Sequence, residues 1–209
     1  MKKILLVIAS KGFQPIEYGV TREILEAEDI KVETASNAKD SLGNAISSDN
    51  KPAHVDYLLQ DVNVDHYDGL FIIGGQDAME HLDNDNMYRL IHEVDRRFNK
   101  IYGAICISTR ILANAGVLED RNVTGWDNDK KLALILKDVG ANYVKAGVVV
   151  DDNIITATGP DEVQDFGQAI LKALYTRQPE TAEDAEHKEA IGETDELIKR
   201  NFPREDIED

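Results

Sequence analysis

The sequence is poor in cysteine and tryptophan: its 209 residues hold one of each, Cys106 and Trp126. A single cysteine excludes an internal disulfide and a metal site built from several thiolates. It also fits a reducing compartment, where disulfides do not persist. No apolar run approaches the roughly 20 residues that a membrane-spanning helix requires. We therefore expect no membrane contact and no metal site, and no motif indicates a cofactor.

Basic residues are outnumbered as well. Lys and Arg number 23 against 40 Asp and Glu, which gives a formal net charge of −17. The phosphates of nucleic acids and of anionic membranes repel such a chain, so neither is expected as a partner. Apolar residues make up 42% of the sequence, which is enough for a folded core.

The first ten residues, MKKILLVIAS, carry two lysines followed by an apolar run, as a signal peptide does. That run is short, however, and Lys11 stands where a small-residue cleavage site would follow. Together with the single cysteine, this predicts a cytoplasmic protein.

Short apolar runs alternate with helical patterns along most of the chain. Strands are expected at residues 4–9, 30–35, 68–73 and 101–105, and a hairpin from 147–152 and 154–158; residues 46–64 are expected to include a short hairpin. Helices are expected at 15–27, 87–98, 130–139 and 161–175. Continuous apolar runs are typical of strands covered on both faces. The pattern predicts an α/β fold, a doubly wound sandwich with a mostly parallel central sheet.

Two of these helices have an apolar face at helical spacing. In the helix 15–27, Ile16, Val20, Ile24 and Ala27 recur at helical spacing. In the helix 87–98, Met87, Leu90, Ile91 and Val94 lie on one face.

The composition changes at Gln178. From there to Asp209 the chain holds 12 acidic and 4 basic residues and few large apolar ones. We therefore expect one domain over residues 1–177 and an acidic C-terminal extension over 178–209. That extension is either a solvated, partly disordered tail or includes a short amphipathic helix near 193–202, and the composition favours neither.

Three features follow strands, at the edge where ligands bind in parallel sheets. Glu17 follows the first strand, Gly74 and Gly75 follow the strand 68–73, and Cys106 follows the strand 101–105. We expect these residues to lie together.

Cys106 stands where a strand becomes a helix, beside backbone N–H groups and the positive end of the helix dipole. Both stabilise a thiolate, which predicts a pKa below the value of about 8.5 of a free thiol. We also expect the strained backbone of a nucleophile turn there. The alternative is a small residue that fills the core, because free cysteine is often buried.

Four segments, YDGLFIIGG, GAIC, AGVLEDRNVTGW and GVVVDDNIITATGPDE, occur in an order that resembles the DJ-1/PfpI superfamily, over roughly residues 2–177. The resemblance implies a flavodoxin-like fold of the glutamine-amidotransferase type, a dimer or hexamer, and a reactive cysteine. It implies that Glu17 hydrogen-bonds the sulfur of Cys106 and that Gly75 and Ile107 offer backbone N–H groups to it, with Gly74 lining the pocket. A glutamate desolvated beside a thiolate should titrate above its ordinary pKa of about 4.3.

Two departures from the family pattern concern the general base. Protease-type members have histidine directly after the cysteine, where this chain has Ile107. Glyoxalase- and deglycase-type members have histidine where this chain has Trp126, which makes the pocket smaller and more apolar. Glu17 is therefore the remaining candidate for proton transfer.

The family resemblance, together with the residues that follow Gly75, predicts a homo-oligomer with the pocket near its interface. Glu80 and His81 are candidates to line that pocket, His81 across the interface. The apolar residues around them, Ala78, Met79 and Leu82, are expected to form the contact.

Two functions are consistent with these residues, and the sequence leaves open whether the protein is an enzyme. In the first, Cys106 attacks a small electrophilic carbonyl compound, such as a 2-oxoaldehyde, or acts as a general cysteine hydrolase, while Glu17 moves the proton. In the second, a non-catalytic stress-response protein senses oxidation through Cys106. An amidotransferase-type triad is disfavoured because no histidine lies between Trp126 and Tyr175.

Overall fold

Strands and helices alternate along the chain in the computed structural model, which describes residues 1–176. The strands are β1 (Lys3–Ile8), β2 (Lys11–Phe13), β3 (Lys31–Ser36), β4 (Asn44–Ser47), β5 (Pro52–His54), β6 (Tyr57–Leu58), β7 (Gly69–Ile72), β8 (Ile101–Ile105), β9 (Asn122–Val123), β10 (Asn142–Tyr143), β11 (Val148–Asp151) and β12 (Ile154–Ala157). The α-helices are α1 (Pro15–Ala27), α2 (Ala78–Leu82), α3 (Asp85–Asp95), α4 (Thr109–Asn114), α5 (Leu132–Asp138) and α6 (Val163–Thr176). Single 3-10 turns lie at Leu59–Asp61, Val64–His66, Cys106–Ser108 and Pro160–Glu162.

The central sheet has seven strands in the order β11-β12-β8-β7-β1-β3-β6. Every neighbouring pair is parallel except β11 and β12, which form an antiparallel hairpin. The predicted doubly wound α/β sandwich with a mostly parallel sheet is therefore confirmed, and so is the hairpin near its end. A second, smaller sheet contains the short hairpin β4–β5, as predicted for that region.

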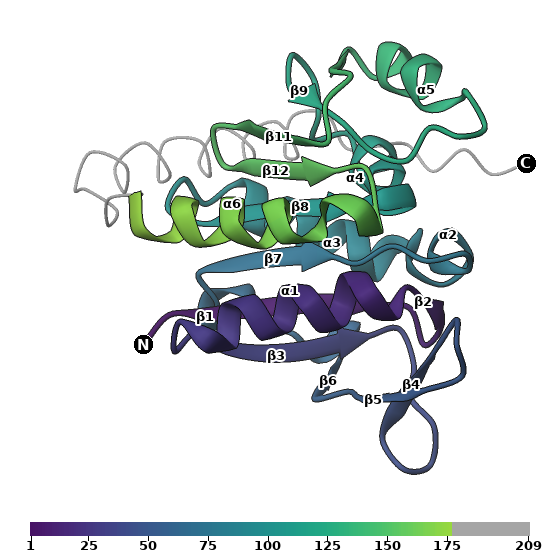
Figure 1. Cartoon of the computed structure of the whole chain (residues 1–209), viewed down its shortest axis with the longest axis vertical. Coiled ribbons are helices and arrows are strands. Elements are labelled where there is room, and N and C mark those ends of the chain that lie inside the picture. The colour runs from purple at the N-terminus through teal and green to yellow at the C-terminus, as the bar shows by residue number, and fades with distance from the viewer. Residues whose placement is uncertain (177–209) are drawn as a thin grey trace, which may run out of the picture. The chain divides into compact units, whose positions relative to one another are not determined.

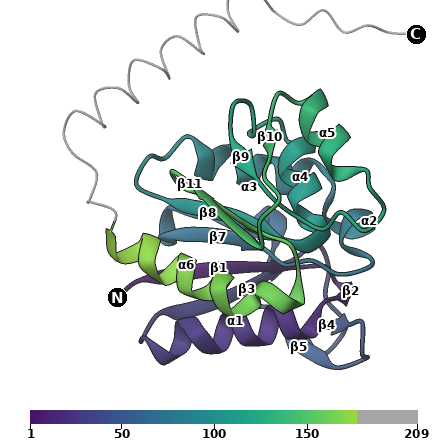
Figure 2. The ribbon, with the colours of Figure 1, turned by 45° about the horizontal axis from the view of Figure 1, so that its top comes forward.

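The sheet is covered on both faces, which explains the continuous apolar runs. Residues 4–9, in and just after β1, are fully buried, each at 0% exposure. Helices α1 and α6 pack together over one face, and α3 and α4 lie on the other (Figures 1 and 2). A strand between two helical layers has no solvent side, so the central residues of β1 are all apolar. The predicted inner face of α3 is confirmed, because its four apolar residues are buried.

The apolar row of α1 does not coincide with the most buried side of the helix. Ile16 is 53% exposed, whereas the next row along the helix, Glu17, Thr21 and Leu25, is buried. The apolar row instead lies on the flank of α1, where Ile24 touches Gly167 of α6. The helix has thus turned a glutamate and a threonine towards the sheet, which is the first indication of a role beyond packing.

The acidic extension predicted for residues 178–209 lies outside the described residues. Within residues 1–176, no helix is both long enough and apolar enough to cross a membrane.

Candidate functional site

The carboxyl ends of β1, β7 and β8 meet at one edge of the sheet. The strand order turns at β1, with β3 on one side and β7 and β8 on the other, and ligands bind at such a turn in open α/β sheets. The structure brings Glu17, Gly74 and Cys106 together at this edge, as their positions after the strands predict. A Cβ atom added to Gly74 would lie 2.5 Å from Cβ of Cys106 and 2.8 Å from Oε2 of Glu17. Only glycine leaves room for both side chains here.

Cys106 lies at the turn between β8 and α4 with a strained backbone. Its φ is 64°, in the left-handed region that few residues other than glycine adopt. Two hydrogen bonds hold the turn: the Ser108 hydroxyl donates to the carbonyl of Ile73 at 2.9 Å, and the N–H of Trp126 donates to the carbonyl of Cys106 at 3.1 Å. The strained turn expected from the sequence is confirmed.

Two backbone N–H groups point at the sulfur, those of Ile107 and Gly75, and each favours its charged form. Gly75 has a φ of 138°, and a Cβ atom there would lie 2.3 Å from the carbonyl oxygen of Gly12. The conformation and the crowding both require glycine. As a result, the N–H of Gly75 can turn towards the sulfur.

Glu17 is fully buried, at 0% exposure. Its Oε2 accepts a hydrogen bond from the N–H of Gly74 at 2.9 Å, whereas Oε1 has no hydrogen-bond partner among the described residues. Burial raises the pKa of Glu17 to about 7, against the opposing effects of the Gly74 N–H and the Cys106 thiol. The structure therefore agrees with a raised pKa for this carboxyl group.

The lowered pKa expected for Cys106 is wrong in this geometry. Burial and the neighbouring charge of Glu17 raise the pKa of the thiol to about 12, and the N–H groups of Ile107 and Gly75 oppose them only in part. Helix α4 has six residues, so its dipole is small. The thiol therefore stays protonated at neutral pH, and the carboxyl group is the member of the pair that titrates there.

Helix α2 packs against the turn that carries Cys106, and the places of Glu80 and His81 in the pocket stay predictions. In α2, Glu80 is exposed and His81 is half-buried, and no hydrogen bond or ion pair within residues 1–176 joins either side chain to Cys106. Ala78 and Leu82 face the core at 0% exposure, so they cannot form the expected subunit contact. The homo-oligomer itself stays a prediction.

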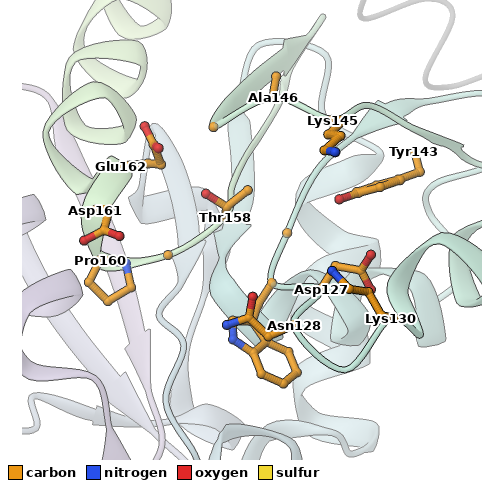
Figure 3. Close-up of a pocket in the computed structure, with 14 residues that line it drawn as sticks. Asp127, Asn128, Lys130, Tyr143, Lys145, Ala146, Thr158, Pro160, Asp161 and Glu162 are labelled. Atoms are coloured by element: carbon orange, nitrogen blue, oxygen red, sulfur yellow. The ribbon is translucent and has the colours of Figure 1, made fainter.

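A cavity of about 740 Å³ lies beside the pair. Its walls come from residues 125–128, Lys130, Tyr143, residues 145–147 and residues 158–162, and Figure 3 shows how they surround it. Cys106 and Glu17 do not line it, but its walls touch both. Trp126 bonds the carbonyl of Cys106, and a Cβ atom added to Gly159 would lie 4.0 Å from the unpartnered Oε1 of Glu17. The cavity therefore adjoins the pair and does not enclose it.

Arg110 is a site neighbour that the sequence reasoning missed. Its side chain is 11% exposed, pairs with both carboxylate oxygens of Asp129 and lies over the ring of Trp126. The sequence did contain a signal, because an arginine in the first turn of an otherwise uncharged helix opposes the helix dipole. Within residues 1–176, no group of three or more His, Cys, Asp or Glu side chains could hold a metal ion.

The fold and this site define a class of α/β proteins in which a cysteine occupies a strained strand-to-helix turn with a buried glutamate beside it. The chain matches the DJ-1/PfpI family over residues 2–173, and it belongs to that family. The family and the flavodoxin-like fold implied by the sequence motifs are confirmed.

The chain is similar to three further proteins. An uncharacterized protein of Methanocaldococcus jannaschii is 36% identical over 177 residues, covering 82% of each chain. The solved ThiJ/PfpI domain protein of Brachyspira murdochii is 28% identical with a TM-score of 0.75, covering 84% of this chain and 98% of its own. A Schizosaccharomyces pombe DJ-1 mutant is 20% identical with a TM-score of 0.73, covering 92% of this chain and 97% of its own, and it supports the fold alone.

Proposed function

We propose that the protein is a cysteine-dependent enzyme in which Cys106 adds to small electrophilic carbonyl compounds while Glu17 moves the proton. The observation that carries this proposal is the state of Glu17: fully buried beside the sulfur, with a pKa of about 7. A general base works best when its pKa lies near the working pH. A buried carboxyl group with an unpartnered oxygen also costs stability, so a role in chemistry gives it a reason to be there.

Cys106 and Glu17 together carry out the addition. The Glu17 carboxylate accepts the thiol proton as the sulfur of Cys106 attacks the carbonyl carbon, so a C–S bond forms and the C=O π electrons move to oxygen. Glu17 then returns the proton to that oxygen, and the product is a neutral thiohemiacetal. One carboxyl group thus acts first as base and then as acid, and no free thiolate is needed.

The departures from the family pattern limit the steps that can come after the addition. Ile107 and Trp126 occupy the positions where other members carry histidine, and no second base lies beside the sulfur among the described residues. Any further proton transfer must therefore use Glu17 again. We expect 2-oxoaldehydes to be turned over slowly for this reason.

A second function is favoured by one specific observation. When Glu17 is protonated, its unpartnered Oε1 can donate a hydrogen bond, and an oxygen added to the sulfur by oxidation would accept it. This supports a redox-sensing role for Cys106. The raised pKa of the thiol opposes it, because oxidants react with the thiolate.

Loss of methylglyoxal in the presence of purified protein tests the catalytic proposal. Cys106→Ser should abolish turnover, and Glu17→Gln should lower it by about 1,000-fold, because the amide keeps the hydrogen bond and cannot carry the proton. Glu33→Gln, which changes a second poorly exposed glutamate, is the matched control and should keep its activity. Turnover that survives in Glu17→Gln would overturn the catalytic role of the pair. Oxidation of Cys106 by peroxide that persists in Glu17→Gln without any turnover in the wild type would favour the redox role.

A further inference from the structure

Arg110 holds the loop that follows β9 against the helix that follows the cysteine. Its Nη1 and Nη2 donate to the two oxygens of Asp129 at 3.0 and 2.6 Å. Such a two-pronged pair fixes direction as well as distance, which a lysine cannot do. The guanidinium lowers the pKa of Asp129, which keeps that carboxylate charged. The loop is therefore tied to α4 at a fixed place.

The same guanidinium lies over an aromatic ring. Cζ of Arg110 is 5.4 Å from the centre of the Trp126 ring, within the range of a cation–π contact. The backbone of Trp126 is held as well, because its N–H donates to the carbonyl of Cys106 at 3.1 Å. Trp126 is thus held at its ring by Arg110 and at its backbone by Cys106.

Trp126 also borders the cavity that lies beside Cys106 and Glu17. Trp126 lines the cavity, whereas Arg110 and Asp129 do not. The guanidinium thus contacts the ring without taking up the space that a ligand in the cavity would occupy. Pro160 and Tyr143 lie on other walls of the same cavity (Figure 3). A planar apolar group would find aromatic and proline surfaces there.

We propose that Trp126 is a stacking surface for a planar, aromatic substituent of the carbonyl substrate, and that Arg110 is the positioning residue that fixes it. This inference rests on the proposed function, because it names the substrate class of the same cysteine. Aryl-substituted carbonyl compounds are then preferred over alkyl ones. The preference comes from the offset stacking of two rings, and the cation behind the indole holds the ring in place.

A pair of chloroketones tests the preference: 2-chloroacetophenone, which carries a phenyl group, and chloroacetone, which carries a methyl group. Both alkylate a thiol by one reaction, in which sulfur displaces chloride, the C–S bond forms, the C–Cl bond breaks and the thiol proton passes to Glu17. Mass spectrometry gives the rate at Cys106 for each reagent. The phenyl-to-methyl ratio of the native protein should exceed that of N-acetylcysteine by about tenfold.

Variants separate positioning from packing. Arg110→Lys and Asp129→Asn each remove the two-pronged pair and should lower the phenyl-to-methyl ratio by about threefold. Trp126→Ala should bring the ratio down to that of the free thiol, and Trp126→Phe should keep part of it. Arg89→Lys, which alters an ion pair on α3, is the matched control and should leave the ratio unchanged. Because Trp126 is the only tryptophan, its emission reports the loop directly, and Arg110→Lys should shift it.

Three results would overturn the inference. A wild-type ratio equal to that of the free thiol removes the stacking surface while leaving the proposed function intact. An equal fall for both reagents in Arg110→Lys shows that Arg110 only maintains the fold. If neither reagent modifies Cys106 in the native protein, while both do so after denaturation, the inference and the proposed function fail together.

Discussion

Two poorly exposed glutamates of this protein have opposite electrostatic states. Glu33, on β3, is 6% exposed and accepts from Lys3, Lys31 and the Tyr67 hydroxyl, each at 2.7 Å. Burial acts against its charge, but these three partners lower its pKa to about 2. Glu17 is 0% exposed and has a single backbone donor, and burial raises its pKa to about 7.

The difference separates a structural carboxylate from a reactive one. Glu33 binds two lysines and a tyrosine hydroxyl, and it is ionised at any physiological pH. Among the described residues no ion pair joins Glu17 to a cation, whereas two lysines pair with Glu33. A carboxyl group left without a counter-charge at the binding edge of the sheet can gain and lose a proton near neutrality.

The largest expected effect on stability comes from Glu17→Gln. Because the folded protein raises the pKa of Glu17 from 4.5 to about 7, its favourable contribution is complete below pH 4.5 and is lost as the pH rises through 7. Relative to the wild type, the variant should therefore gain about 3 kcal/mol in the free energy of unfolding between pH 4.5 and pH 8. Urea unfolding at several pH values measures this. A difference that does not change with pH would mean that Glu17 has an ordinary pKa.

The next effect concerns the pH dependence of alkylation. Below pH 7 the rate at which iodoacetamide alkylates Cys106 should rise tenfold per pH unit, because the ionised fraction of Glu17 rises by that factor. Above pH 7 the rate should level off, because Glu17 is then ionised while the thiol keeps its proton. The rate at pH 5 should thus be about 100-fold below the plateau. In Glu17→Gln the rate should go on rising past pH 7. A fast reaction that persists at pH 5 would instead support the thiolate expected from the sequence.

Glu33→Gln should have the opposite effect on stability, and a smaller one. The pKa of Glu33 is lowered, so its contribution is present above pH 4.5 and is lost only as the pH falls through about 2. Removing the charge at pH 7 leaves Lys3 without its carboxylate and should cost about 2 kcal/mol. Thermal or urea unfolding at pH 7 checks this, with unchanged circular dichroism as the control for fold. A variant as stable as the wild type would show that the cluster contributes nothing.

Much of the fold and the core of the site could be predicted from sequence, because local patterns determine them. Buried parallel strands have continuous apolar runs, and the run from Ile4 to Ala9 identified β1 without ambiguity. The ends of such strands share an edge, so the positions of Glu17 and Cys106 predicted that they meet. The strained turn was expected from a cysteine placed between a strand and a helix.

The rest depends on tertiary contacts that no local pattern records. Two rows of α1, one led by Ile16 and one by Glu17, share the same helical spacing, and only packing decides which row faces the sheet. The pKa of Cys106 depends on how deeply the sulfur is buried and on the charge of Glu17. Neither quantity can be inferred from the sequence around Cys106. The contact of Arg110 with Asp129 joins residues 19 positions apart.

The titration of Glu17 itself tests the account most directly. With glutamate labelled at its side-chain carboxyl carbon, carbon NMR should show one resonance that titrates with a midpoint of about 7 and is absent from Glu17→Gln. A second resonance, absent from Glu33→Gln, should stay ionised until the pH approaches about 2. Replacing Cys106 by serine should perturb the first resonance and not the second, because only the first belongs to the pair. A midpoint for Glu17 at or below 4.5 would contradict the proposal that it carries the proton for Cys106.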